Sequence, residues 1–255
     1  MTSHEQQVLQ QFDAQAGAYL HSAVHAAGPD LAHAVLTVAA SVAPQATALD
    51  VGCGAGHLTF ALAAVVAQVT AVDPSPGMLG TVAAAAAARG LPNVRTRQAS
   101  AAALPFDDGE YAVTASRYSA HHWPDVPAAL AEMRRVLRPD GHLLMVDILG
   151  GSTPLLDTHL QAAELLRDPS HVRDYTCSEW RALINTAGFE VLEARSWPVR
   201  LEFASWVQRM RTPAEDAAAI RRLQTGAPRE VRDGLAIEAD GSFTARVGLF
   251  WARVA

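Results

Sequence analysis

The order of apolar runs along the chain constrains its fold more than any other sequence feature. Apolar runs at residues 46–51 and 68–73 predict buried strands, and further predicted strands alternate with segments of helical character. The predicted strands span residues 46–51, 68–73, 93–98, 111–116, 142–149, 189–196 and 243–254, and the predicted helices 57–67, 75–89, 125–137 and 178–187. Strands and helices that alternate at this spacing form βαβ units, whose right-handed crossovers produce a parallel sheet. We therefore predict an α/β fold with a doubly wound, mostly parallel seven-stranded sheet, helices on both faces, and a final antiparallel strand at the sheet edge.

Three segments fall outside this alternation, at residues 1–40, 150–177 and 197–242. Each is too long for a structureless connection, so we expect each to contain helices. The chain is interpreted as one domain over residues 1–255, with an N-terminal helical segment and a ligand-binding core at 45–150. Ligands of such sheets bind at the carboxyl ends of the strands. We therefore interpret the two later segments as helical insertions that cap a substrate.

Composition narrows the range of partners. A formal net charge of -6 and a pI of about 5.9 argue against nucleic acid, whose phosphates attract clustered Lys and Arg. Cys53 and Cys177 show neither a metal-ligand spacing nor a disulfide framework, so no metal site is predicted. The first eleven residues lack the basic-then-apolar order of a secretory leader, and no apolar run is long enough to span a bilayer. We expect a soluble, cytoplasmic protein whose oligomeric state stays open.

A glycine-rich loop, Asp50-Val-Gly-Cys-Gly-Ala-Gly56, joins the first predicted strand to its helix. Its third glycine comes one residue too early for the dinucleotide fingerprint G-x-G-x-x-G, and His57 occupies the position that the fingerprint requires. Glycines allow a tight turn and close approach of a ligand. The carboxylate of Asp50 would repel a pyrophosphate, but it can engage an ammonium group directly or through water. This pattern favours S-adenosylmethionine over a dinucleotide.

Further candidate ligand contacts follow the next three strands. Asp73 ends the second strand about 20 residues after the first glycine, where an acidic side chain accepts hydrogen bonds from ribose hydroxyls; it could instead cap the following helix. After the third strand, the Ser100 side chain or the Ala101 N–H is expected to meet the adenine. After the fourth strand, Arg117 leaves the sheet beside the expected sulfonium position.

Four sequence blocks, at residues 49–58, 69–79, 99–111 and 130–147, resemble class I methyltransferases of the ubiquinone and menaquinone biosynthesis type. The segment at 167–173 resembles a subgroup of their bacterial relatives. Together, the loop, the strand ends and this resemblance imply a cofactor site for S-adenosyl-L-methionine formed by Tyr19, Asp50, Gly52, Cys53, Gly54, Gly56, Asp73, Pro74, Met78, Ser100, Ala101 and Arg117. The family often has Asp where this chain has Ser100, so the adenine contact is expected to be weaker or to use the backbone alone.

The expected reaction is an in-line methyl transfer to a small-molecule acceptor, such as a quinone precursor or another small metabolite. A sulfonium methyl is already activated, so the protein supplies mainly orientation and desolvation, and no metal is needed. His121 and His122 are the candidate catalytic bases for an acceptor that must lose a proton; solvated or packing roles are the alternative. A non-enzymatic cofactor-binding protein and an NAD-dependent oxidoreductase are the competing functions.

Overall fold

The computed structural model describes residues 3–13 and 28–255, in which seven strands form one sheet in the order β3-β2-β1-β4-β5-β7-β6. The strands are β1 (Thr47–Val51), β2 (Gln68–Asp73), β3 (Val94–Gln98), β4 (Tyr111–Arg117), β5 (Leu137–Leu149), β6 (Phe189–Leu201) and β7 (Phe243–Val254). Strands β1 to β5 pair in parallel, and β7 pairs antiparallel with both β5 and β6. The predicted doubly wound sheet with an antiparallel last strand is confirmed.

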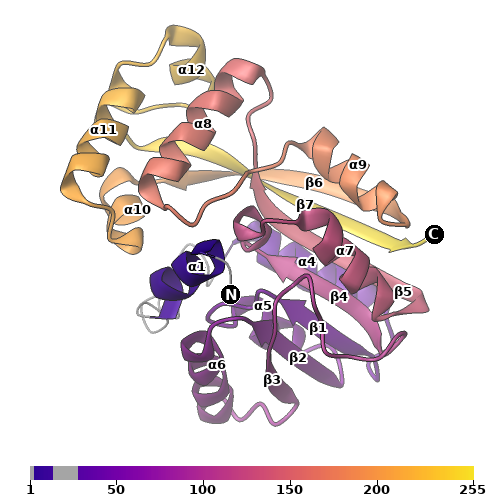
Figure 1. The fold of residues 1–255 in the computed structure, drawn as a ribbon. Helices are drawn as coiled ribbons and strands as arrows, with labels where there is room; N and C mark the ends of the chain where they lie inside the picture. Colours follow the sequence, from indigo (N-terminus) through magenta and orange to yellow (C-terminus); the bar gives the residue numbers. More distant parts are fainter. Residues whose placement is uncertain (1–2, 14–27) are drawn as a thin grey trace.

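Helices cover both faces of the sheet (Figure 1). One face carries α4 (Pro29–Ser41), α5 (His57–Leu62) and α6 (Pro76–Ala88), and the other carries α7 (Val126–Arg135) and α9 (Cys177–Thr186). Alternate residues of the buried strands point to opposite faces. In β5, Leu144 and Val146 pack in the cluster beneath α4 and α5, whereas Leu143 and Met145 pack in the cluster beneath α7 and α9. This two-sided burial explains why the central strands β1, β2, β4 and β5 are mainly apolar runs rather than alternating ones.

Four helices form a group beyond the carboxyl end of β5, seen at the upper left of Figure 1. They are α8 (Pro154–Arg167), α10 (Phe203–Met210), α11 (Ala214–Thr225) and α12 (Arg229–Gly234), and we call them the cap helices. Leu160, Trp206 and Ile220 form a buried core of their own with Phe243 of β7. Helix α1 (Ser3–Asp13) contacts α6 and reaches the cap, where the Gln11 side chain donates a hydrogen bond to the Met210 carbonyl at 2.8 Å.

The structure corrects the sequence predictions at several boundaries. Helix α5 ends at Leu62 rather than at residue 67. Strand β5 begins at Leu137 rather than at residue 142, because β4 and β5 remain paired, with a shift in register, across the expected turn. Strand β6 continues to Leu201, which pairs with Phe243 as a ribbon leading to the cap helices. The prediction that the last strand lies at the sheet edge is wrong. Strand β7 lies between β5 and β6, and β6 forms the edge.

Three properties of the described residues bear on partners and chemistry. No helix within residues 3–13 and 28–255 is long and apolar enough to cross a membrane. The same residues contain no group of three or more His, Cys, Asp or Glu side chains arranged to hold a metal ion. Cys53 is buried, Cys177 is exposed, and both are free thiols.

Candidate functional site

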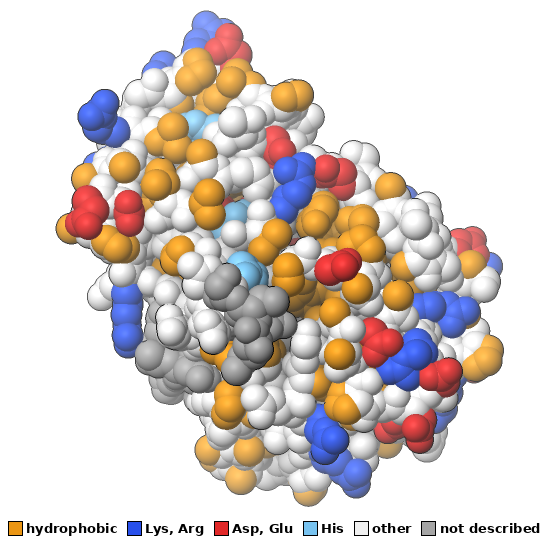
Figure 2. All heavy atoms as spheres, in the orientation of Figure 1, with side chains coloured by type: hydrophobic (Ala, Val, Ile, Leu, Met, Phe, Trp, Pro, Cys, Tyr) orange, Lys and Arg blue, Asp and Glu red, His pale blue; other side chains and the backbone are white. Residues whose placement is uncertain are grey.

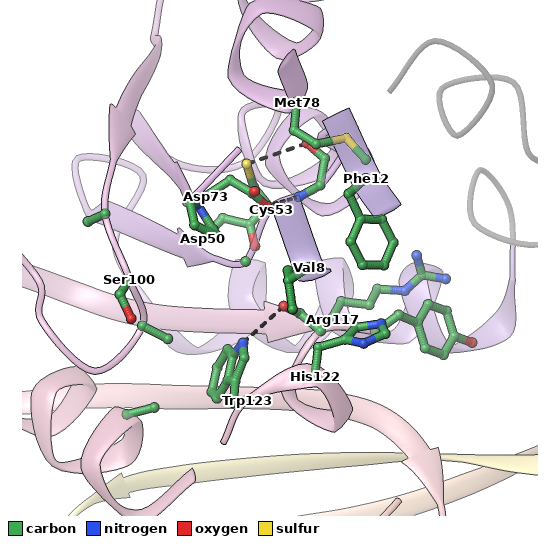
Figure 3. A pocket seen from close by; sticks show the side chains of 18 of the residues that line it. Val8, Phe12, Asp50, Cys53, Asp73, Met78, Ser100, Arg117, His122 and Trp123 are labelled. Carbon is green, nitrogen blue, oxygen red and sulfur yellow. Dashed lines mark hydrogen bonds between the residues drawn. The ribbon is translucent and has the colours of Figure 1, made fainter. Parts of the chain in front are cut away.

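A cavity of about 380 Å³ lies at the carboxyl ends of β1, β2 and β4, within the size range of small-molecule sites (Figure 3). Apolar and histidine side chains gather on the middle of this face of the molecule, between the cap helices and the sheet (Figure 2). The predicted site residues that line the cavity are Asp50, Gly52, Cys53, Gly54, Asp73, Pro74, Met78, Ser100, Ala101, Arg117 and His122. Gly56 and His121 are not among the lining residues, and Tyr19 falls outside the described residues.

The glycines of the loop have different roles. The Gly52 N–H donates to the Val72 carbonyl at 2.8 Å, which fixes the end of β1 against β2. Gly52 has φ +69, and a Cβ there would lie 1.9 Å from the Ser119 hydroxyl, so only glycine fits. Gly56 has φ +89 at the start of α5, and a Cβ there would lie 2.8 Å from the Phe60 ring. Gly56 therefore serves helix packing rather than the cavity wall.

The Asp73 carboxylate connects the glycine loop to α6. Its Oδ2 accepts a hydrogen bond from the Gly54 N–H and its Oδ1 accepts one from the Ser75 N–H, both at 2.9 Å. The side chain that caps α6 is that of Ser75, whose hydroxyl accepts from the Met78 N–H at 3.0 Å. Each carboxylate oxygen can accept more than one hydrogen bond. Asp73 thus orders two loops and lines the cavity at the same time.

Asp50 presents a buried carboxyl group to the cavity. Its Oδ2 accepts a hydrogen bond from the Thr59 hydroxyl at 2.6 Å, and its Oδ1 has no hydrogen-bond partner among the described residues. Burial raises the pKa of Asp50 to about 7, and the Thr59 hydrogen bond acts against that rise. A buried carboxyl with an unpartnered oxygen requires a donor. The ammonium group of an amino acid supplies one, so this end of the cavity fits the predicted ligand.

The Thr59 hydrogen bond has a measurable effect on stability. We expect Thr59→Val to lower the free energy of unfolding at pH 8 by about 1.5–3 kcal/mol, because a hydrogen bond to a charged carboxylate is lost. At pH 5, below the Asp50 pKa of about 7, the carboxyl is neutral and the loss shrinks to about 1 kcal/mol. Chemical denaturation at both pH values measures the difference. Thr114→Val is the matched control, since the buried Thr114 hydroxyl has no hydrogen-bond partner in the described part of the chain. Equal losses at the two pH values would contradict the assignment.

Arg117 is held by an acidic residue that the sequence analysis did not identify. The Arg117 Nε donates to the Asp30 carboxylate of α4 at 2.6 Å, and both side chains are buried. The guanidinium carbon lies 4.3 Å from the centre of the Tyr118 ring. Helix α4 thus fixes the position of a cation at the cavity wall. The pair joins residues 87 positions apart, and nothing in the local sequence of either residue indicated it.

The two candidate bases have opposite protonation states. His121 Nδ1 lies 2.6 Å from the Asp147 carboxylate, and although burial opposes the charged form, Asp147 raises the pKa of His121 to about 9. Burial and the neighbouring His121 charge hold the pKa of His122 well below its usual 6.5. At neutral pH, His121 is therefore cationic and His122 neutral. Of the two, only His122 lines the cavity with an imidazole able to accept a proton.

Helix α1 contributes side chains to the cavity that the sequence analysis missed. His4, Val8 and Phe12 occur at a spacing of four, so they share one helix face, and all three line the cavity. Figure 3 shows Val8 and Phe12 at its wall. The Phe12 ring meets the His122 ring edge to face, with centroids 4.9 Å apart. The spacing was visible in the sequence, but one helical face does not reveal what it contacts.

The chain is similar to one family model and to several known proteins. Residues 49–145 match the family model described as a methyltransferase domain. The chain is 47% identical over 196 residues to the uncharacterized protein YafE of Escherichia coli, covering 77% of this chain and 95% of that one. It is 34% identical over 226 residues to the uncharacterized methyltransferase YcgJ of Bacillus subtilis, covering 89% and 88% of the two chains. The YcgJ crystal structure matches with a TM-score of 0.82 and 32% identity, over 88% of this chain and 97% of that one.

The similarity to quinone-modifying enzymes is more limited. The ubiquinone/menaquinone biosynthesis C-methyltransferase UbiE of Brucella canis is 33% identical over 127 residues. That match covers 48% of this chain and 47% of that protein. It therefore leaves out about half of each chain, and an acceptor does not follow from it.

Proposed function

The chain belongs to the class I S-adenosylmethionine-dependent methyltransferases, and we propose that it methylates a small-molecule acceptor bound between the sheet edge and the cap helices. The observation that carries this proposal is the wall shared by Asp50 and Asp73. An unpartnered buried carboxyl oxygen and a second carboxylate lie at the end of one cavity, at the strand edge where such sheets bind ligands. An amino acid joined to a nucleoside matches both groups, whereas a pyrophosphate would be repelled.

In this proposal, residues of the chain orient the cofactor and exclude water. S-adenosylmethionine, when bound, supplies an activated methyl group for in-line displacement. Asp50 accepts from the ammonium, Asp73 from the ribose hydroxyls, and the loop with Ser100 and Ala101 borders the adenine. Val8 and Phe12 of α1 cover the cavity from the other side, and this burial removes water from the transfer path.

The cap helices support a small acceptor rather than a macromolecule. Helices α8 and α10 border a second cavity beside the cofactor site, which has a volume of about 70 Å³. A space of this size is roughly half of the ~150 Å³ that holds a benzene ring, so it admits one end of a small molecule. A quinone precursor is one candidate within the class, supported by the partial match to the Brucella canis enzyme.

The function is tested by incubating the chain with methyl-labelled S-adenosylmethionine and fractionated metabolite extract. We expect label to appear in a small-molecule fraction, and calorimetry to detect binding of S-adenosylhomocysteine but not of NADH. Label that appears only in protein or nucleic acid would overturn the small-molecule acceptor. Binding without transfer to any fraction would favour a non-enzymatic role.

His122 provides a further test once an acceptor is found. For an acceptor that loses a proton, we expect His122→Gln to lower kcat on the order of 100-fold, the low end for general bases because the imidazole is a weak base here. Adenosylhomocysteine affinity should stay within twofold, as roughly expected for a residue that does not hold the cofactor. Comparison of kcat with the calorimetric Kd separates the two effects. His33→Gln, at a half-buried position away from the cavity, is the control. An unchanged kcat would remove His122 from the chemistry.

A further inference from the structure

The second cavity is a polar chamber between the core and the cap helices. It is bordered by His121 and His122 after β4, by Glu164 and Arg167 of α8, and by Asp174 in the loop after α8. Phe12, Tyr118 and His122 line both this chamber and the cofactor cavity, so the two spaces share one wall. A molecule in the chamber would therefore lie next to the cofactor site.

Three charged side chains of the chamber, Glu164, Arg167 and His121, are held in ion pairs. The Arg167 Nε donates to the Glu164 carboxylate at 2.9 Å, and both residues are buried. Arg167 and the nearby histidines outweigh the effect of burial and lower the pKa of Glu164. The cationic His121 is held by Asp147 at 2.6 Å. One buried acid that borders the chamber lies outside these ion pairs.

That acid is Asp174, a residue that borders the chamber and is 2% exposed. Its Oδ2 has no hydrogen-bond partner among the described residues. Burial and the Glu164 carboxylate raise the pKa of Asp174 well above its usual range. The Gln161 side chain holds both backbone groups of Asp174: its Oε1 accepts from the Asp174 N–H at 3.1 Å, and its Nε2 donates to the Asp174 carbonyl at 2.7 Å. The Asp174 backbone is thus fixed, and one oxygen of its buried carboxyl group lacks a hydrogen-bond partner among the described residues, which is uncommon for a buried polar group.

We propose that Asp174 binds a hydroxyl group of the methyl acceptor, and that the acceptor is a neutral, otherwise apolar molecule whose hydroxyl-bearing end enters the polar chamber. This inference rests on the proposed function for the role of the bound molecule. Ile148, Leu201 and Trp206 supply apolar walls for its body. The hydroxyl at Asp174 anchors the acceptor, while the face toward Tyr118 and His122 presents the atom to be methylated.

The charges of the chamber select against ionised acceptors. Arg167, Arg209 and the cationic His121 border the chamber, so an ammonium group would meet three positive charges. A carboxylate would meet the Glu164 carboxylate and would leave the Asp174 oxygen without a donor. A neutral O–H donor satisfies the Asp174 oxygen without adding a charge. A site with a buried polar group discriminates strongly against ligands that leave it unpaired.

Four one-ring probes test this inference: benzyl alcohol, toluene, benzylamine and benzoate. Each is titrated into the chain in the presence and absence of saturating adenosylhomocysteine, and the indole N–H resonances of two tryptophans report the site. Trp206 borders the chamber, and Trp123 borders the cofactor cavity. We expect benzyl alcohol to shift the Trp206 resonance with an affinity about tenfold above that of each other probe, since it alone satisfies Asp174 without a charge.

Variants of Asp174 complete the test. Asp174→Ala should remove the preference for benzyl alcohol over toluene, and Asp174→Asn, which retains an oxygen acceptor, should keep part of it. Thermal denaturation shows whether each variant folds, and Asp233→Asn on the exposed side of α12 is the control. Equal binding of toluene, tighter binding of benzoate or benzylamine, or a preference that survives Asp174→Ala would overturn the inference. Failure of adenosylhomocysteine to bind would overturn the proposed function instead, because the Trp206 titration without it still measures recognition in the chamber.

Discussion

Asp73→Ala is expected to weaken adenosylhomocysteine binding by two to four orders of magnitude. The Asp73 carboxylate is expected to accept hydrogen bonds from two ribose hydroxyls. A hydrogen bond to a charged group contributes about 1.5–3 kcal/mol, so the loss of two amounts to roughly 3–6 kcal/mol. The same carboxylate accepts from the Gly54 and Ser75 N–H groups at 2.9 Å, so the variant also loosens the glycine loop. Isothermal calorimetry measures the change.

Two further variants separate ribose binding from loop order. Asp73→Asn retains an oxygen acceptor for one N–H group and should lose less affinity than the alanine variant. Asp107→Ala, at an exposed position in the loop after β3, is the control and should bind as tightly as the wild type. An affinity loss below tenfold in Asp73→Ala would mean that the ribose does not contact this carboxylate.

The cofactor-facing half of the molecule was predictable because its signals are local in sequence. The loop at residues 50–56 and Asp73 each follow an apolar run, and a parallel sheet brings the carboxyl ends of adjacent strands together. Strand pairing sets Asp50 beside Ala71 and Asp73 beside Gln98, which accounts for the common edge. Gly56 is the exception within the loop, since its positive φ serves the contact of α5 with α6 rather than the cavity.

The remaining features depend on contacts between distant segments. Nothing near Arg117 in the sequence indicates Asp30, and nothing near His121 indicates Asp147. Yet Asp30 positions the Arg117 cation, and Asp147 makes His121 cationic. The insertion of β7 between β5 and β6 was also hidden, because a strand pattern shows which face is buried but not which strand is the neighbour. For the same reason, the shared wall of cofactor cavity and polar chamber could only come from the structure.

The pH dependence of cofactor binding is expected to follow Asp50. Burial raises the pKa of this carboxyl to about 7, whereas a ligand ammonium beside it favours the ionised form and lowers the pKa on binding. Below pH 7, ligand must therefore displace a proton, and affinity falls by up to tenfold for each pH unit. Because binding releases a proton from Asp50, adenosylhomocysteine affinity should decrease roughly 100-fold from pH 8 to pH 5.

Calorimetry at half-unit steps across this range, in two buffers of different ionisation enthalpy, tests the linkage, because binding near pH 6 should release about one proton per site. Asp50→Asn cannot ionise, so it should bind more weakly than the wild type at pH 8 and show an almost flat profile. Asp107→Asn is the matched control and should retain the wild-type slope. A steep profile that persists in Asp50→Asn would assign the titration to another cavity group, and a flat wild-type profile would remove the ammonium from the Asp50 end of the cavity. The flat profile would overturn the proposed orientation of the cofactor, since the unpartnered Asp50 oxygen is what directs the amino acid to that end.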